Sequence, residues 1–196
     1  QDKETGYEQV APTVYALVAA IDAKDSFTFQ HSTNVSQYAV LLAQKLGLSR
    51  NDIQTVKVAG LLHDIGKIGI PESILKKAGK LTNEEYEIMK SHVEKSIEMI
   101  HYLPNMNYVI PAVVSHHERY DGKGYPRGIK GEEIPFLGRI LAVCDSFDAM
   151  ISKRAYKEPL SVEYAMGELE KNKGTQFDPE VADAFIELIK EGKVPL

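Results

Sequence analysis

Five of the six histidines in this 196-residue chain stand near acidic residues in an order that suits metal binding. The candidate ligands are His31, His63, Asp64, His92, His116, His117 and Asp145. Imidazole and carboxylate groups together bind divalent ions such as Mn, Fe, Ni or Zn. Two such ions about 3.5–4 Å apart can hold a bridging hydroxide and stabilise an in-line displacement at phosphorus. These residue types therefore predict a metal-dependent site for phosphoryl chemistry.

Each candidate ligand also has an ordinary explanation. A single histidine on a helix more often packs in the core or lies on the surface than binds a metal. The pair His116-His117 would also suit the carboxyl end of a helix, where it interacts with the helix dipole. We interpret His101, outside the pattern, as structural or exposed, and Cys144 as a small core residue. The metal hypothesis therefore depends on the combination of residues.

The elements that must position these side chains are predicted to be helices. Apolar residues recur at helical spacing, Thr82-Asn83-Glu84-Glu85 is typical of a capping box, and His31 is expected to open a helix. Pro111 should kink its helix or mark its true start. The expected helices cover residues 11–23, 35–46, 53–63, 82–100, 106–118, 136–151, 161–171 and 181–189. The predicted fold is an all-α, single-domain helical bundle with two long functional loops, residues 65–80 and 119–135.

Composition limits the classes of partner. The net charge of −5 gives no overall attraction to long nucleic acids or anionic membranes. The one cysteine excludes an intrachain disulfide and a cysteine-based zinc cage. The longest apolar run, residues 14–21, is far shorter than the roughly 18 residues that span a bilayer. A polar start without Met indicates a piece of a longer protein, and we expect a cytoplasmic location.

Four longer motifs carry a resemblance to a known family. They are HDIGKIGIP at residues 63–71, HHERYDGKGYP at 116–126, RILAVCDSFDAM at 139–150 and FDP at 177–179. In this order they resemble the HD-GYP domain, a subgroup of the HD phosphohydrolase superfamily, from about residue 20 to about residue 189. The resemblance implies an HD-type helical bundle over residues 20–196, preceded by an extension or linker helix at residues 1–19.

The resemblance implies a role for each candidate ligand. Four positions match the ligand set of the wider superfamily, namely His31, His63, Asp64 and Asp145. Three more match the histidines that complete a second metal in this subgroup, namely His92, His116 and His117. Asp64 would bridge both ions. The expected cofactors are two divalent metal ions, with Fe, Mn or Ni favoured.

The resemblance also implies residues that act on the substrate. Lys67 would join Asp64 as a catalytic residue by reaching a phosphate oxygen, although it could instead be a solvated loop lysine. Asp148 would support a metal ligand. The remaining implied substrate contacts are Asp25, Arg154, Lys157 and the loop Gly124-Tyr125-Pro126. Residues 119–130 hold four basic side chains against Asp121 alone, which suits either an anionic substrate or a solubilising loop.

One position departs from the family pattern. Members with three metals carry a glutamate four residues before the first histidine, where this chain has Phe27. Residues 27 and 31 share one helical face, so a glutamate at 27 would reach the same ion as His31. A phenyl ring cannot bind a metal and offers apolar packing at the mouth of the site. We therefore predict two metals rather than three.

The function implied by these matches is hydrolysis of cyclic di-GMP to linear pGpG, to GMP or to both. One alternative is an HD-type phosphohydrolase for another nucleotide, such as cyclic GMP-AMP or a nucleoside monophosphate, although the Gly-Tyr-Pro loop favours cyclic dinucleotides. Another is a cyclic-dinucleotide-binding signalling module with weak catalysis. The implied partners are an upstream sensor or receiver domain, a GGDEF-type signalling protein at the Gly-Tyr-Pro loop, and a second copy in a homodimer.

Overall fold

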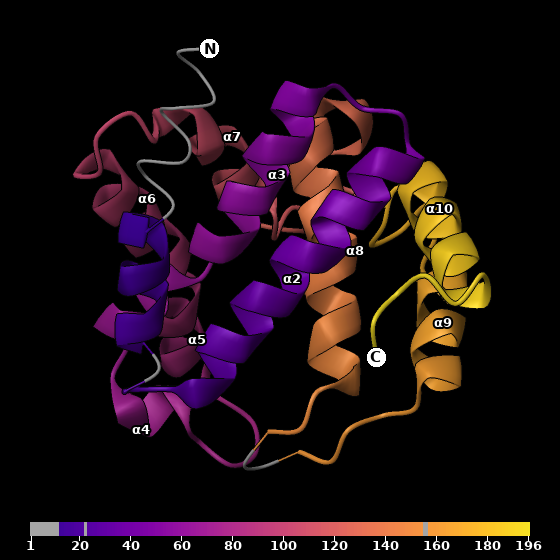
Figure 1. Cartoon of the computed structure of the whole chain (residues 1–196). Coiled ribbons are helices and arrows are strands. Elements are labelled where there is room, and N and C mark those ends of the chain that lie inside the picture. The colour runs from indigo at the N-terminus through magenta and orange to yellow at the C-terminus, as the bar shows by residue number, and fades with distance from the viewer. Residues whose placement is uncertain (1–11, 22, 155–156) are drawn as a thin grey trace.

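The computed structural model describes residues 12–21, 23–154 and 157–196, and this part of the chain is helical (Figure 1). It contains no β-strand and shows two isolated bridges, Arg154–Lys157 and Lys173–Phe177. After a first helix at residues 12–21, the α-helices are α2 (Ser26–Lys45), α3 (Arg50–Leu62), α4 (Glu72–Leu75), α5 (Asn83–Lys90), α6 (His92–His101), α7 (Ile110–Ser115), α8 (Phe136–Ile151), α9 (Val162–Lys171) and α10 (Pro179–Lys190). Three 3-10 helices are η1 (Ile65–Gly69), η2 (Asn107–Val109) and η3 (Gly131–Glu133). The predicted all-α class is confirmed, and none of the described helices is long and apolar enough to cross a membrane.

The first described helix packs into the main core. Val14, Val18 and Ile21 are buried within the same apolar cluster as residues of α2, α3 and α8. Residues 1–11, which make up most of the expected extension, lie outside the described part. The predicted domain boundary near residue 20 stays a prediction.

Helices α2 and α3 form an antiparallel hairpin that brings two candidate ligands together. Gly47 takes a φ of 72° in the short connection, a conformation that glycine adopts without strain. The helices approach so closely that a Cβ at Gly60 would lie 2.7 Å from the Cα of Ser36. Because the helices run in opposite directions, His31 near the start of α2 lies beside His63, just after the end of α3.

Helix α8 crosses behind α2 in Figure 1 and carries the candidate carboxylates of the third long motif. The ring of Phe147 packs edge-on against Tyr38 of α2 and Phe185 of α10, with centroid distances of 5.6 and 4.9 Å. Gly138 lets α7 lie directly against α8, because a Cβ there would meet the Oγ of Ser115 at 2.0 Å. These contacts fix α8 between α2, α7 and α10.

The helix predicted from Thr82 to Ile100 is broken at Ser91, so that part of the prediction is wrong. The capping box at Thr82 is present at the start of α5. The Oγ of Ser91 donates to the carbonyl of Ile88 at 2.5 Å, a local bond that competes with the helical backbone pattern. As a result His92 begins α6 instead of lying within a continuous helix.

The expectation that His31 opens a helix is also wrong. Helix α2 begins at Ser26, because the carboxylate of Asp25 caps it by accepting bonds from the Phe27 N–H (3.1 Å) and the Thr28 hydroxyl (2.7 Å). His31 therefore lies in the second turn, where the backbone is fully helical.

The segments expected as loops contain short helices. Residues 65–80 include η1 and α4, and residues 119–135 include η3. Of the two alternatives predicted for Pro111, the structure shows a helix start, because α7 begins at Ile110. The turn before it is the 3-10 helix η2. The short α7 ends at Ser115, which places His116 and His117 directly after it.

Candidate metal centre

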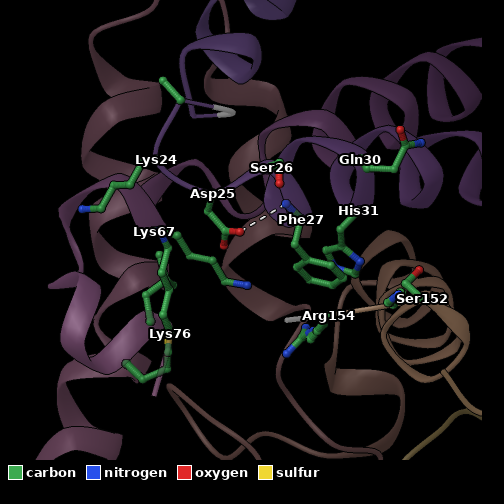
Figure 2. A pocket seen from close by; sticks show the side chains of 14 residues that line it. Lys24, Asp25, Ser26, Phe27, Gln30, His31, Lys67, Lys76, Ser152 and Arg154 are labelled. Atoms are coloured by element: carbon green, nitrogen blue, oxygen red, sulfur yellow. Dashed lines mark hydrogen bonds between the residues drawn. The ribbon is translucent and has the colours of Figure 1, made fainter. Parts of the chain in front are cut away.

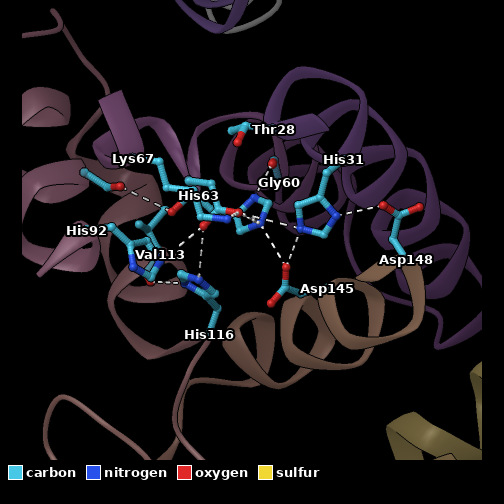
Figure 3. A network of polar contacts seen from close by, with 12 residues as sticks. Thr28, His31, Gly60, His63, Lys67, His92, Val113, His116, Asp145 and Asp148 are labelled. Atoms are coloured by element: carbon cyan, nitrogen blue, oxygen red, sulfur yellow. Dashed lines mark hydrogen bonds and ion pairs between the residues drawn. The ribbon is translucent and has the colours of Figure 1, made fainter. Parts of the chain in front are cut away.

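The candidate ligands converge in one place, where Figure 3 shows the side chains of His31, His63, His92, His116 and Asp145 close together. Within the described residues, their donor atoms form two groups, and all atoms within a group lie within 4.8 Å of one another. Cluster one consists of His31, His63, Asp64 and Asp145. Cluster two consists of Asp64, His92, His116 and His117. The seven residues that the sequence singled out thus meet in one place.

Cluster one surrounds Oδ2 of Asp64 and Oδ1 of Asp145. The Nε2 of His31 lies 2.6 Å from Asp145 Oδ1 and 3.6 Å from Asp64 Oδ2. The Nε2 of His63 lies 3.2 Å from each of these two oxygens. Two imidazole nitrogens and two carboxylates therefore face one small volume.

Cluster two surrounds the other oxygen of the same carboxylate. Oδ1 of Asp64 lies 3.3 Å from His92 Nε2 and 3.9 Å from His116 Nε2. The Nε2 of His117 lies 3.3 Å from that of His92. Because Asp64 directs one oxygen to each cluster, it has the geometry that a carboxylate bridging two ions requires.

Backbone carbonyls orient three of the histidines. Each Nδ1 lies near the carbonyl oxygen three residues earlier: His63 at 2.6 Å from Gly60, His92 at 2.7 Å from Met89, and His116 at 2.5 Å from Val113. A carbonyl oxygen only accepts, so Nδ1 carries a proton, and in the neutral form of each ring Nε2 holds the lone pair. This is the tautomer that binds a metal through Nε2.

His31 is oriented by a side chain instead. Its Nδ1 lies 2.7 Å from Oδ2 of Asp148, which is fully buried. The other oxygen of Asp148 accepts from Nδ2 of Asn34 at 3.0 Å. A buried carboxylate behind a ligating imidazole fixes the ring and raises its basicity. Asp148 thus lies behind cluster one and outside it, within reach of His31 alone among the cluster-one ligands.

The carboxylates of cluster one favour protonated imidazoles when no cation is bound. Burial lowers the pKa of His63, but Asp64 and Asp145 outweigh it and raise that pKa to about 10. Burial also lowers the pKa of His31, but Asp145 and Asp148 outweigh this effect and raise that pKa above its usual value. In turn the histidines hold the pKa values of Asp64 and Asp145 well below the usual range, against the effect of burial.

Two histidines of cluster two, His116 and His117, have lowered pKa values instead. Burial, with repulsion from neighbouring histidines, holds the pKa of His116 well below its usual value. Burial lowers the pKa of His117 to about 4. The Nε2 of His116 is buried and has no hydrogen-bond partner. An orphaned imidazole nitrogen facing a carboxylate, within two sets of N and O donors, fits a pair of divalent ions.

A cavity of about 780 Å³ opens beside cluster one (Figure 2). The start of α2, the segment around η1 and α4, and the residues after α8 form its walls. Among the described residues, Asp25 is the one acidic side chain that lines it, and the five basic ones are Lys24, Lys67, Lys76, Lys153 and Arg154. In a chain of net charge −5, this excess of positive charge favours a ligand with several negative charges.

Three of the predicted substrate contacts lie in the cavity wall, and Lys157 does not. Asp25, Lys67 and Arg154 line the cavity. Nζ of Lys67 lies 3.2 Å from Oδ2 of Asp64, beside the ions that cluster one would hold. Lys157 pairs through its backbone with Arg154, but its exposed side chain is not part of the cavity lining.

The Gly-Tyr-Pro loop lies against cluster two. Gly124 is required there, because a Cβ would meet the carbonyl oxygen of His117 at 2.5 Å. The ring of Tyr125 stacks on His117, with centroids 4.9 Å apart and an interplanar angle of 16°. The peptide bond between Tyr125 and Pro126 is cis. These residues cover a candidate ligand and do not line the cavity.

Glu118 anchors this loop, a role that the sequence analysis missed. Its buried Oε1 accepts from the backbone N–H groups of Arg127 (2.6 Å) and Gly128 (3.1 Å). The positive charge expected of residues 119–130 is partly neutralised, because Arg119 pairs with Asp121 at 3.0 Å. None of these residues lines the cavity beside cluster one, so its charge comes from elsewhere.

The missed basic residues of the cavity come from separate parts of the chain. Nζ of Lys24 donates to the carbonyls of Ile68 (2.5 Å) and Ile70 (2.8 Å), which ties the segment around η1 to the start of α2. Lys76, directly after α4, and Lys153, in the segment after α8, line the same cavity. No local spacing signals these positions, since only the tertiary fold brings them together.

Comparison with known proteins identifies the family of this chain. Residues 16–181 match a family described as the HD domain. The chain belongs to this family. The HD domain here is 44% identical over 190 residues to a cyclic di-GMP phosphodiesterase of Thermotoga maritima, and this alignment covers 95% of the chain and 52% of that relative. It is 39% identical over 176 residues to the 3′3′-cGAMP-specific phosphodiesterase 2 of Vibrio cholerae, and that alignment covers 89% of the chain and 34% of the relative.

The likeness extends to solved structures. The crystal structure of a V. cholerae cyclic GMP-AMP phosphodiesterase, V-cGAP3, has a TM-score of 0.73, covers 93% of this HD domain and 49% of that chain, and shares 19% sequence identity. These matches confirm the resemblance to HD-GYP domains. The chain spans about half the length of the T. maritima relative and about a third of the V. cholerae one.

Proposed function

We propose that this HD domain is a metal-dependent phosphodiesterase that hydrolyses cyclic di-GMP. The proposal is carried by two ligand clusters that share Asp64 and lie beside a positively charged cavity. A bound pair of ions supplies an activated water and neutralises charge at phosphorus. The name of the T. maritima relative supports the choice of substrate.

The cavity residues have distinct roles in this proposal. Lys67 neutralises the phosphate that reacts, because its ammonium lies beside Asp64. Arg154 holds phosphate oxygens from the segment after α8. Asp25 keeps its capping bonds and offers its remaining acceptor capacity to the nucleoside. Lys157 would contribute only after its exposed side chain turns toward the cavity.

We propose two resident ions, with Fe, Mn or Ni favoured and Asp64 as the bridging ligand. The ring of Phe27 stacks on His31, with centroids 5.1 Å apart, and so fills the position from which a glutamate would hold a third ion. The product, linear pGpG or GMP, depends on whether the linear dinucleotide is released before a second cleavage.

Cyclic GMP-AMP is the second candidate substrate. The 39% identity to a V. cholerae enzyme named for that substrate favours it. Both nucleotides carry two phosphates in a ring, so the charge of the cavity does not distinguish between them. Parallel hydrolysis assays on the two nucleotides distinguish the two candidate substrates. A higher catalytic efficiency for cyclic di-GMP than for cyclic GMP-AMP supports the first proposal.

The decisive experiment is anaerobic purification, loading with Mn, Fe or Ni, and chromatography of the products. We expect conversion of cyclic di-GMP to linear products with each competent ion. Tight binding without turnover under all three ions would favour the binding-module alternative. Lys67→Ala and Arg154→Ala should keep their metal content but lose catalytic efficiency, whereas Lys171→Ala, on the distant helix α9, should match the wild type.

The remaining partners are proposals about a longer protein. Both relatives extend far beyond the matched region, which supports a regulatory sensor or receiver domain in the parent chain. A GGDEF-type partner at the Gly-Tyr-Pro loop, a homodimer and a cytoplasmic location stay predictions.

A further inference from the structure

We infer that Phe27 is a positioning residue that presents Arg154 to the nucleotide. The inference rests on the proposed function, because it concerns a side chain of the same cavity. The guanidinium carbon of Arg154 lies 4.0 Å from the centre of the Phe27 ring, and the ring itself stacks on His31 at an interplanar angle of 15° (Figure 2). Phe27 thus lies between the cation and a candidate metal ligand.

Arg154 needs such a support. It belongs to the segment after α8, its side chain is exposed, and its backbone N–H and carbonyl pair with those of Lys157. Within the described residues no Asp or Glu side chain pairs with its guanidinium. An unsupported arginine loses considerable rotamer freedom when it binds a ligand. A ring face that already holds the guanidinium reduces this cost, because the cation is attracted to the π electrons.

Phe27 is itself rigidly placed. Its backbone N–H donates to Oδ1 of Asp25 at 3.1 Å, which fixes it in the first turn of α2. Its ring lies against His31, whose own ring is fixed by the buried carboxylate of Asp148 at 2.7 Å. The orientation of an exposed arginine is thereby tied to the rigid interior of the domain.

The ring also leaves the arginine chemically free. A carboxylate partner would occupy the N–H donors of the guanidinium, as Asp64 occupies the ammonium of Lys67 on the other side of the cavity. A phenyl ring offers no oxygen acceptor to the guanidinium, so the N–H donors of Arg154 stay available for phosphate oxygens. Phe27 therefore orients Arg154 without competing with the substrate.

A double-mutant cycle tests this coupling. Phe27→Leu keeps an apolar side chain but removes the ring face, and we expect KM for cyclic di-GMP to rise roughly two- to fivefold, with kcat and metal content little changed. Phe27→Tyr, which keeps the face, should restore the wild-type KM. In the Arg154→Ala background, Phe27→Leu should have no further effect on KM. Additive effects would overturn the inference.

A matched control lies two residues away on the same helix. Phe29 is a partly buried phenylalanine that packs against the core, so Phe29→Leu makes the same chemical change without touching Arg154. Its effect on KM, if any, should persist unchanged in the Arg154→Ala background. Dependence of this control on Arg154 would show that the coupling reflects general loosening of α2.

A second measurement requires no turnover. In zinc-loaded protein, which is diamagnetic, the side-chain Nε–H resonance of Arg154 should be shifted by the ring current of Phe27. Phe27→Leu should abolish the shift and Phe27→Tyr should retain it; an unchanged resonance in Phe27→Leu would overturn the inference. If the wild type instead shows this shift but never hydrolyses cyclic di-GMP, the proposed function fails while the positioning role of Phe27 stands.

Discussion

Cluster one and cluster two share Asp64 but differ in charge. Cluster one combines two carboxylates with two histidines, whereas cluster two has the shared carboxylate and three histidines. The extra charge attracts cations to cluster one, yet it also raises the pKa values of His31 and His63, so protons compete there with a metal. Burial keeps His116 and His117 neutral in cluster two. The same residue types thus make one site with two carboxylates, where protons compete with a metal, and one site with a single shared carboxylate, where His116 and His117 keep free lone pairs.

The largest expected effect removes the residue that the clusters share. Asp64→Ala should abolish binding of both ions, because each cluster loses a carboxylate oxygen. Turnover should fall by more than about a hundredfold. Mass-spectrometric metal analysis of dialysed protein, with a hydrolysis assay, measures both changes. Asp183→Ala, an exposed carboxylate on α10, is the control, and full metal content in Asp64→Ala would contradict the bridging role.

Substitutions on each side should then separate the clusters. Asp145→Asn affects cluster one and His116→Ala affects cluster two, so each variant should retain one ion of the two. The loss of affinity should be larger for Asp145→Asn, because it also removes a negative charge. Titration of metal-free protein with Mn, followed by binding stoichiometry, measures this. If either variant lost both ions equally, the clusters would be one cooperative unit.

A smaller effect should follow from the carboxylate behind His31. Asp148→Asn keeps the shape of the side chain but removes the charge that orients the imidazole at 2.7 Å. We expect metal affinity to fall about ten- to a hundredfold in cluster one and to stay unchanged in cluster two. Calorimetry on the Asp148→Asn protein resolves the two binding steps. Equal weakening of both steps would mean that Asp148 acts through the fold.

The smallest expected effect is a difference in proton release. The pKa of His63 is raised from 6.5 to about 10. Without a bound ion its ring therefore stays protonated across this pH range, where an ordinary histidine has lost its proton. At pH 6.5 an ion entering cluster one should therefore displace about one proton or more, and its affinity should rise with pH. His117, with a pKa of about 4, has no proton to lose there. Calorimetry in buffers of different ionisation enthalpy counts the protons, and equal release from both clusters would refute the comparison.

The candidate ligands could be singled out from the sequence because most of them stand in contiguous motifs. His63-Asp64 and His116-His117 each follow a helix end, and Asp145 lies within an apolar helix, but their assignment as ligands came from the combination of motifs and its resemblance to HD-GYP domains. The all-α class followed from the same helical spacing of apolar residues.

One feature that the sequence did not reveal is local, because the helix breaks at Ser91, whose hydroxyl donates to the carbonyl of Ile88, although the apolar spacing continues through this position. The other features depend on contacts between distant parts of the chain. Lys24 reaches the cavity through carbonyls more than forty residues away. Phe27 could be recognised as a residue that binds no metal, but its stack between His31 and Arg154 requires α2 and the segment after α8 to meet.

The carbonyls that orient His63, His92 and His116 belong to the last turns of α3, α5 and α7, where a helix leaves its final acceptors without partners of its own. A substitution at residue 89 or 113 changes a side chain and leaves its carbonyl in place, whereas residue 60 must stay glycine because a Cβ there would lie 2.7 Å from the Cα of Ser36. The tautomers of His92 and His116 are thus set by the backbone and are insensitive to these point mutations, unlike that of His31, which one codon change at Asp148 can disturb. A designer who wishes to transplant a metal site can copy this arrangement by placing a histidine just beyond a helix end, with no supporting side chain to graft.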